Sequence, residues 1–229
     1  MAIIWLDIET VPSPNKPDPS AIATPANYKD PKKIEEYQLA KVDDTWREEA
    51  LNSARGRVLC IGWAVGNSPA VCRGIWDNTE AQLLECFNDV VQHTISDRKS
   101  DGITWGGFNL REFDLNWIWH RAVKHDLAAL LDFIPRERFA KNVLDVRERW
   151  TGGNPYGKGK LKDIARFLGI PTMDMDGSDV LDLYVAGEFD KIASYCKADV
   201  EMTRAIAHRM GTGNPPAIAR TKDPFAAAV

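Results

Sequence analysis

The sequence predicts an α/β fold with a mixed, five-stranded central sheet flanked by helices. Residues 3–9 form an apolar run typical of a buried strand, and two further apolar runs at 57–65 and 70–76 are joined by the turn signal GNSP. Helical patterns then alternate with two more strand candidates. Three sequential strands followed by this alternation are typical of an α/β domain.

The first strand carries two acidic residues near its C-terminal end. Side chains in a strand alternate between its two faces. Ile4, Leu6 and Ile8 therefore share one face. Asp7 and Glu9 share the other face. Like charges this close repel, and burial makes each charge costlier, so a positive group is expected between them.

The remaining elements follow from apolar spacing and from cap and turn residues. Helices are expected at 33–53, 80–95, 113–125, 160–168 and 188–210, and strands at 103–109 and 142–146. Thr79 is expected to cap the helix that follows it, and Gly169 is expected to end the helix before it.

The domain organisation is expected to be simple. One domain should cover residues 1–210, and a flexible tail of Gly, Pro and Ala should cover 211–229. A loop rich in Pro, Lys and Asp followed by a helix should form an insertion at 12–55, packed beside the core.

Composition excludes several classes of protein. A chain of 229 residues with 44% hydrophobic and 27% charged residues is typical of a globular protein with a real core. We expect a cytoplasmic protein with no membrane association, because no apolar run is long enough to span a bilayer and no secretion signal is visible. The four cysteines lack paired spacing and are expected to be small core residues. The net charge of −4 excludes a wholly basic nucleic-acid binder, although residues 147–166 carry six basic and two acidic side chains.

Two further carboxylates stand out by position. Asp114 lies in the first turn of an expected helix, where the helix dipole favours negative charge. Asp199 lies four residues after Tyr195 on the last expected helix, so their side chains should point to the same place. Taken singly, each of these two acids is better explained as a helix cap or a surface charge.

Three short motifs contain these residues. DIET begins at Asp7, FNLREFD ends at Asp114 and YCKAD ends at Asp199. In this order, and on a strand, a helix and a helix, they resemble the three motifs of the DEDD superfamily, the DnaQ-like 3′–5′ exonucleases. The resemblance spans residues 3–210 apart from the insertion, and it implies a ribonuclease H-like fold.

The subtype can be recognised from two positions. Tyr195 matches the tyrosine-type branch, whereas the histidine-type branch has His where this chain has Ser194. The motifs are most similar to the proofreading domains of family B DNA polymerases. The chain has no room for a polymerase part, and the polymerase motif DTD is absent.

Hard carboxylate ligands suit Mg²⁺ or Mn²⁺, and two such ions can clamp the attacking and leaving oxygens of a phosphodiester. The resemblance implies that Asp7 bridges both ions. It implies that Glu9 and Asp199 complete the site of the water-activating ion. Asp114 should hold the second ion, largely through water, and Tyr195 should orient the nucleophilic water. The cations would also supply the positive charge expected between the acids of the first strand.

The same resemblance implies substrate contacts. Thr10 and Asn109 match positions that often touch the terminal nucleotide. Phe108 and Phe113 are candidates for stacking on a base, although aromatic residues beside a strand end often belong to the core.

The stretch GGNPYGKGK at 152–160 nearly matches a phosphate-binding loop, GxxxxGK[ST]. Gly159 stands where that loop needs a hydroxyl to ligate Mg²⁺, and no clear apolar strand leads into it. A flexible basic loop fits better, with Lys158 and Lys160 near the substrate backbone.

The expected activity is metal-dependent hydrolysis of single-stranded DNA from its 3′ end, releasing nucleoside 5′-monophosphates, with a replication or repair protein as a possible partner. Three alternatives remain open: an exoribonuclease of the ribonuclease D type, a catalytically silent fold that binds nucleic acid or a polymerase, and a phosphate-loop nucleotidase. The sequence leaves the oligomeric state open.

Overall fold

The structure is a computed structural model that describes residues 2–96, 102–137, 140–154 and 156–212. Its strands are β1 (Ala2–Val11), β2 (Arg57–Val65), β3 (Val71–Gly74), β4 (Ile103–Gly107) and β5 (Val143–Asp145). Its α-helices are α1 (Pro31–Glu48), α2 (Glu80–Ser96), α3 (Asp114–Lys124), α4 (Ala128–Leu131), α5 (Val146–Trp150), α6 (Leu161–Phe167), α7 (Val180–Val185) and α8 (Phe189–Arg209). Short 3-10 helices are η1 (Pro19–Ala21), η2 (Glu49–Leu51) and η3 (Gly177–Asp179).

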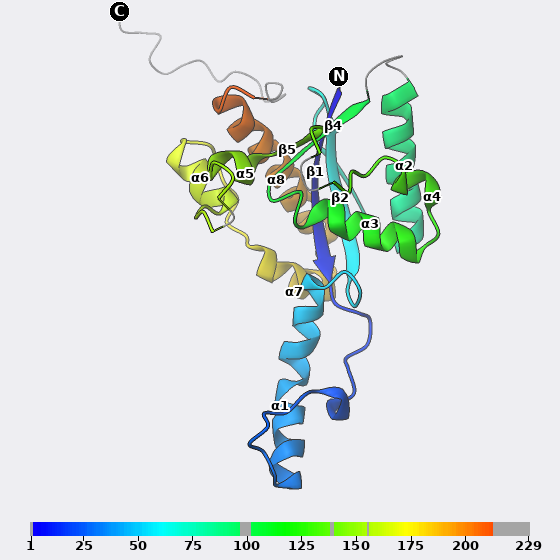
Figure 1. The fold of residues 1–229 in the computed structure, drawn as a ribbon, viewed down its shortest axis with the longest axis vertical. Helices are drawn as coiled ribbons and strands as arrows, with labels where there is room; N and C mark the ends of the chain where they lie inside the picture. Colours follow the sequence, from blue (N-terminus) through cyan, green and yellow to red (C-terminus); the bar gives the residue numbers. More distant parts are fainter. Residues whose placement is uncertain (1, 97–101, 138–139, 155, 213–229) are drawn as a thin grey trace, which may run out of the picture.

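The strands form one mixed sheet in the order β3-β2-β1-β4-β5. Strand β1 lies at its centre, antiparallel to β2 and parallel to β4, and β5 runs parallel to β4 (Figure 1). The predicted hairpin of β2 and β3 is present and antiparallel. The prediction of a mixed five-stranded sheet with flanking helices is therefore confirmed.

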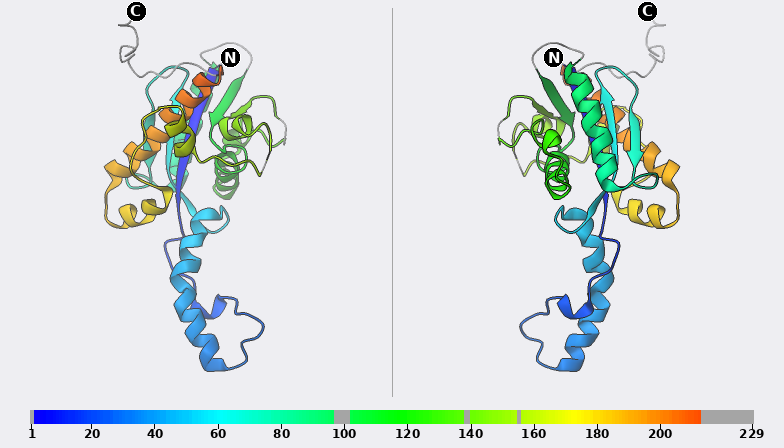
Figure 2. Two further views of the ribbon diagram at one scale, coloured as in Figure 1. Left: turned by 90° about the vertical axis from the view of Figure 1, so that its left-hand side faces the viewer. Right: turned by 90° about the vertical axis from the view of Figure 1, so that its right-hand side faces the viewer.

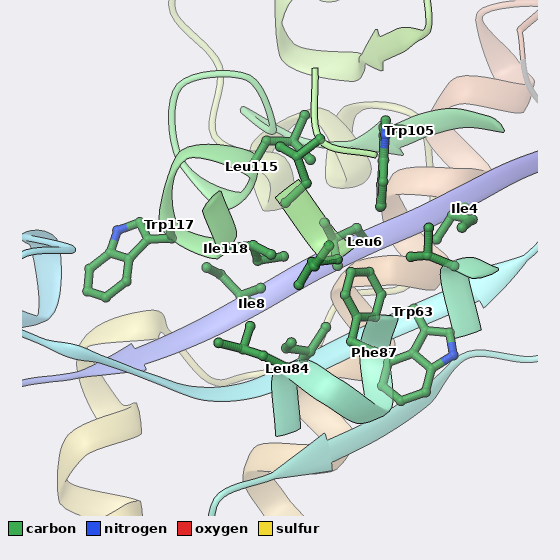
Figure 3. Packing of buried hydrophobic residues seen from close by; sticks show 14 of the residues in the cluster. Ile4, Leu6, Ile8, Trp63, Leu84, Phe87, Trp105, Leu115, Trp117 and Ile118 are labelled. Carbon is green, nitrogen blue, oxygen red and sulfur yellow. The ribbon is translucent and has the colours of Figure 1, made fainter. Parts of the chain in front are cut away.

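The two faces of the sheet bury different sets of residues. Ile4, Leu6 and Ile8 pack against Phe87 of α2 and Ile118 of α3, in the cluster shown in Figure 3. Fully burying one such side chain contributes about 1.5–3 kcal/mol, so this face is a main source of stability. The alternation predicted for the first strand thus holds, and it leaves the opposite face of β1 free for other side chains.

That opposite face is covered by the C-terminal helices. Trp5 of β1 packs with Val200 and Ile206 of α8 and with Ile164 of α6. Figure 2 shows α8 on one side of the sheet and α2 and α3 on the other. The acidic pair on β1 consequently faces α8.

The helix ends follow the predicted signals. The Thr79 hydroxyl accepts a hydrogen bond from the backbone of Gln82, and the Gln82 side chain accepts from the backbone of Thr79, which is a capping box. Gly169, after α6, has a φ of 70°, which a residue without Cβ adopts readily.

Three helices were not predicted. Helices α4, α5 and α7 have 4, 5 and 6 residues, which is too short for an apolar repeat to be recognised. Strand β4 also ends earlier than expected, at Gly107, because Asn109 adopts a left-handed φ of 56° that no strand contains.

The insertion differs in part from its expected packing. No residue of α1 is buried among the described residues, and the helix projects away from the sheet (Figures 1 and 2). Contacts hold it near its C-terminal end: the Trp46 indole donates to the Ser13 carbonyl, and the Ser13 hydroxyl donates to Glu49. Trp46 also packs, partly buried, against the cluster that contains Val11 and Leu59. The expected packing beside the core therefore holds near the C-terminal end of α1, whereas the rest of the helix projects away.

The last expected segment, the tail at 211–229, lies mostly outside the described residues. Within the described ranges, no helix combines the length and hydropathy that crossing a bilayer requires.

A buried ion cluster ties α2 and α3 to the start of β2. The Glu80 carboxylate accepts from the backbone of Val58 at 2.8 Å and from the Arg121 guanidinium at 2.8 and 2.5 Å, and it lies 2.9 Å from the His125 ring. Burial alone would raise the pKa of Glu80, but the hydrogen bonds from Arg121 and His125 lower it below its ordinary value. The Arg121 side chain also donates to the carbonyl of Ser53 and is 1% exposed.

We expect Arg121→Ala to lower the free energy of unfolding by about 3–5 kcal/mol, because it leaves the buried carboxylate of Glu80 uncompensated. Urea unfolding would measure this. Arg47→Ala is the matched control, since Arg47 forms exposed ion pairs with Asp43 and Asp182 and its loss should lower the stability far less than the loss of Arg121. Equal losses in the two variants would contradict the prediction.

Candidate active site

Strand β1 presents Asp7 and Glu9 on the face away from the main core. A β-bulge follows directly: Glu9 pairs with Cys60 of β2, whereas Thr10 pairs with Val58, so one residue of β2 is skipped. A bulge bends its strand and increases the local twist. The acidic pair therefore lies next to the point where the regular pairing of β1 with β2 is interrupted.

Helix α8 brings two more polar groups to this face. One carboxylate oxygen each of Asp7, Glu9 and Asp199 lies within 4.8 Å of the other two. Tyr195 lies one helical turn before Asp199, and its phenol interacts with that carboxylate. The predicted convergence of β1 and the last helix is therefore present in the structure.

Helix α3 supplies the fourth acid. One carboxylate oxygen of Asp114 accepts a hydrogen bond from the backbone N–H of Ile8 at 3.0 Å. Ile8 is the residue between Asp7 and Glu9, so Asp114 is fixed directly beside the pair. Strand β4 pairs with β1 only as far as Trp5, which leaves the N–H of Ile8 available.

The electrostatics of the site reflect this crowding. Burial raises the pKa of Asp7 well above its ordinary value, and the neighbouring carboxylates raise it further. Burial also raises the pKa of Glu9, with the charges of Asp199 and Asp114 adding to it. For Asp114, burial outweighs the backbone hydrogen bonds that would lower its pKa.

The acid on α8 is perturbed less. Burial raises the pKa of Asp199 to about 6, against a hydrogen bond from Tyr195 and the positive charge of Lys162, both of which lower it. Burial and the negative charge of Asp199 raise the pKa of Tyr195 far above its ordinary value, so the phenol stays protonated at neutral pH.

The residues present fit a pair of hard divalent cations. One oxygen each of Asp7 and Asp199 is buried and has no hydrogen-bond partner among the described residues. A buried, unsatisfied carboxylate oxygen is costly unless a cation occupies it. Clustered carboxylates with raised pKa values and free oxygens are the ligands that Mg²⁺ or Mn²⁺ would take.

A groove of about 550 Å³ opens beside Tyr195 and Asp199. Its basic wall comes from α6 and its cap residue, with Lys160, Lys162 and Arg166 among the lining residues. Lys162 lies over the ring of Tyr195, with its Nζ 5.2 Å from the ring centroid. Positive side chains thus border the acidic centre on the side open to a ligand.

The groove also contains acids that the sequence did not single out. Asp174, Asp176 and Asp179 line it, and the charge of Asp176 raises the pKa of both Glu9 and Asp199. These acids come from the segment between α6 and α7, whose short 3-10 helix gave no periodic signal.

The sequence-predicted substrate residues have mixed surroundings. The Thr10 hydroxyl donates to the carbonyl of Ala50 at 2.5 Å. Phe108 packs against the cluster that includes α5, α6 and α8, and Phe113 packs against the main core beside Trp117. Both rings are half-buried, so core packing accounts for much of each side chain.

Asn109 is held by its neighbours. Its side-chain oxygen accepts from the Arg147 guanidinium at 3.0 Å, and its backbone N–H donates to Asp145 at 3.1 Å. Asp145 is 5% exposed and also accepts from the backbone of Arg111. Asp145 therefore fixes the loop that carries Asn109. Asp145 was not singled out from the sequence, because the helix that it caps, α5, is too short to be recognised.

The loop at 152–160 does not have the setting of a phosphate-binding loop. Helix α5 leads into it, not a strand, and the helix that follows has 7 residues. Lys158 and Lys160 are both exposed, and Lys160 lines the groove whereas Lys158 is not among its lining residues. This setting opposes the nucleotidase alternative.

Comparisons with known proteins agree with the fold and identify a family for most of the chain. Residues 74–212, more than half of the chain, match a family described as "Predicted 3'-5' exonuclease related to the exonuclease domain of PolB". A comparison with curated protein sequences found no match.

Among solved structures, the chain is similar to the family B DNA polymerase of the hyperthermophilic archaeon Pyrobaculum calidifontis. The TM-score is 0.60 at 14% sequence identity, over 92% of this chain and 24% of the polymerase. At this identity the similarity shows the fold alone, and the chain spans about a quarter of that polymerase.

Asp199→Asn should change how the stability of the metal-free protein depends on pH. A carboxyl group whose pKa is higher in the folded than in the unfolded state stabilises the fold at a pH below its pKa in the unfolded state, which is about 4. This stabilisation is lost as the pH rises through the pKa of Asp199 in the folded state, which is about 6. Between pH 4 and 7, the wild type should therefore lose up to about 3 kcal/mol more unfolding free energy than the variant. Urea unfolding with a chelator present would measure it, and parallel pH profiles would contradict it.

Proposed function

The chain belongs to the family of predicted 3′–5′ exonucleases related to the exonuclease domain of PolB. From this premise we propose that it hydrolyses single-stranded DNA from the 3′ end and releases nucleoside 5′-monophosphates. The single observation that supports this most is the gathering of Asp7, Glu9 and Asp199 within 4.8 Å, with Asp114 hydrogen-bonded to the backbone between the first two.

In this proposal Asp7, Glu9, Asp114 and Asp199 hold two Mg²⁺ or Mn²⁺ ions. When bound, such a pair of cations supplies a nucleophile at neutral pH and neutralises the charge that develops on the phosphate. The protein contributes the buried carboxylates, whose mutual repulsion favours the binding of positive charge. The free oxygens of Asp7 and Asp199 support this assignment.

Tyr195 would orient the attacking water. Its raised pKa keeps the phenol protonated, so it can donate or accept a hydrogen bond but is a poor base at neutral pH. The water oxygen attacks the terminal phosphorus, and the bond to the 3′ oxygen of the preceding nucleotide breaks. The shortened strand keeps a 3′ hydroxyl.

The basic wall of the groove would bind the phosphates of the strand. Lys160, Lys162 and Arg166 lie on one side of the acids, where they can pair with a phosphodiester backbone. Asn109 and Thr10 lie near the ends of β4 and β1 and are proposed to contact the terminal nucleotide. Since Arg147 binds the side chain of Asn109, that arginine would set its orientation.

A catalytically silent fold is less well supported. Such a protein has no need for four clustered acids, and their repulsion destabilises the fold unless cations are bound. Asp114 and Asp199 are buried, and Asp7 and Glu9 are partly buried. Each of the four acids and Tyr195 lies at the site in this chain.

Asp7→Ala should abolish cleavage and leave the fold intact. Removing a residue that hydrogen-bonds to a metal ligand typically lowers metal affinity or activity about 10- to 100-fold. Losing a ligand itself should therefore lower the cleavage rate at least about 100-fold. Oligonucleotides labelled at the 3′ or 5′ end, incubated with Mg²⁺ or a chelator, would measure rate and polarity. Loss of a carboxylate also relieves repulsion, so the metal-free variant should be at least as stable as the wild type.

Glu112→Ala is the matched control for Asp7→Ala, because Glu112 is an exposed acid two residues before Asp114. It should retain wild-type activity. Products that arise from the 5′ end or from internal cleavage would overturn the proposed polarity. Faster cleavage of an RNA strand of the same sequence would contradict the proposed DNA substrate and assign RNA as the substrate instead.

Tyr195→Phe should retain part of the activity, because the acids remain. We expect kcat to fall about 10- to 100-fold. This corresponds to the loss of one hydrogen bond to a charged group, which contributes about 1.5–3 kcal/mol. Single-turnover kinetics would measure it. A loss as large as that of Asp7→Ala would assign the phenol a direct part in proton transfer.

A further inference from the structure

Three cysteines that are far apart in the sequence meet beside the acidic site. Cys60 of β2, Cys72 of β3 and Cys196 of α8 have sulfur atoms that all lie within 4.8 Å of one another. All three are free thiols. The sequence predicted small core residues at the cysteines; Cys60 and Cys196 are buried as expected, whereas Cys72 is half-buried and Cys86 is exposed. The cluster itself was not predicted, because only the folded sheet brings the three thiols together.

The sheet and the helix each account for part of the cluster. Cys72 pairs with Gly62, two residues after Cys60, so the two thiols lie on the same face of the hairpin. A Cβ at Gly62 would come within 2.6 Å of the Cys196 sulfur. The missing side chain therefore lets α8 place its thiol against the strands.

The spacing suits a soft cation. Zinc binds thiolates at about 2.3 Å, which places sulfurs about 3.8 Å apart around one tetrahedral ion. Sulfurs within 4.8 Å of one another need to move by about 1 Å or less to reach that spacing. Cys60 and Cys196 are buried and Cys72 is half-buried, so the site is open on one side for entry and for a fourth ligand.

A disulfide within the hairpin fits less well. Diagonal neighbours on adjacent strands have Cα atoms about 7–8 Å apart, beyond the reach of an unstrained disulfide. Hydrogen bonds from the two other thiols, with the positive charges of Lys197 and Arg73, lower the pKa of Cys72 below its ordinary value. The most accessible of the three is thus the one most readily deprotonated.

We propose that Cys60, Cys72 and Cys196 form a second metal site that takes one soft divalent cation, such as Zn²⁺ or Cd²⁺. Each thiol that ligates the ion gives its proton to solvent. Hard ions such as Mg²⁺ do not compete, because they prefer oxygen ligands.

The site is connected to the acids through the backbone. The Cys196 thiol donates to the carbonyl of Asp7 at 3.6 Å, Cys60 is the strand partner of Glu9, and Cys196 follows Tyr195. Ligation removes the thiol proton that the Asp7 carbonyl accepts, and it draws α8 toward β2. Occupancy should therefore inhibit cleavage, a consequence that rests on the proposed function.

Cadmium titration of the reduced, chelator-treated protein in excess Mg²⁺ tests the site, because cadmium thiolates absorb in the ultraviolet and carboxylates do not. The wild type should bind one Cd²⁺ per chain with this absorption. Cys72→Ser should bind at least about 10-fold more weakly, since it removes one of three thiolate ligands. Cys86→Ser, at an exposed cysteine outside the cluster, should match the wild type.

Absence of the thiolate absorption in the wild type, or equal binding by Cys72→Ser, would overturn the site. Urea unfolding of Cys72→Ser and Cys72→Ala checks that both variants fold. In the nuclease assay, Zn²⁺ should inhibit the wild type and Cys86→Ser but not Cys72→Ser. Equal Zn²⁺ inhibition of all three proteins would overturn the link to catalysis, while the metal site itself would still stand on the cadmium titration. If the chain has no nuclease activity, the proposed function fails and the cadmium result is unaffected.

Discussion

Mutual repulsion among buried carboxylates is the constraint around which this fold is arranged. Asp7, Glu9 and Asp199 lie within 4.8 Å of one another, and burial raises the pKa of each. Such a cluster opposes the docking of α8 on β1. The docking persists because Trp5 and the apolar face of α8 bury a separate cluster on the same side of the sheet. Apolar packing thus holds together carboxylates whose mutual repulsion is relieved by bound cations or, in the metal-free protein, by protonation.

The placement of Asp114 shows how sheet topology creates the site. Strand β4 leaves β1 after Trp5, so the backbone of Ile8 lacks a strand partner on that side. An unpaired buried N–H is costly, and the Asp114 carboxylate satisfies it. This bond fixes α3 against the strand, and it fixes the acid beside Asp7 and Glu9. A defect in strand pairing therefore determines where the fourth carboxylate lies.

Local patterns in the sequence predicted the elements that are long enough to repeat. The period-two alternation of β1 identified both its core face and its acidic face, and Thr79 and Gly169 marked helix ends. The meeting of acids from β1, α3 and α8 came from motif order, because no local rule reports a contact across more than a hundred residues. Lys162 and the three cysteines were not singled out for the same reason: each depends on which elements become neighbours. The projecting helix α1 shows the opposite error, in which apolar spacing indicated a packed face that the fold provides only near its C-terminal end.

Two kinds of ligand set lie side by side on the face of the sheet that α8 covers, and their chemistry keeps them separate. The oxygen ligands come from β1, α3 and α8, and Asp199 among them lines the groove, whereas the sulfur ligands come from β2, β3 and α8. Hard cations prefer the first set and soft cations the second, so the same helix can serve both without exchange of ions. Because Cys196 and Asp199 are fixed on one rigid helix, a shift that satisfies sulfur geometry must also move the carboxylate. A single helix therefore provides the mechanical link through which a thiol ligand would influence the acids.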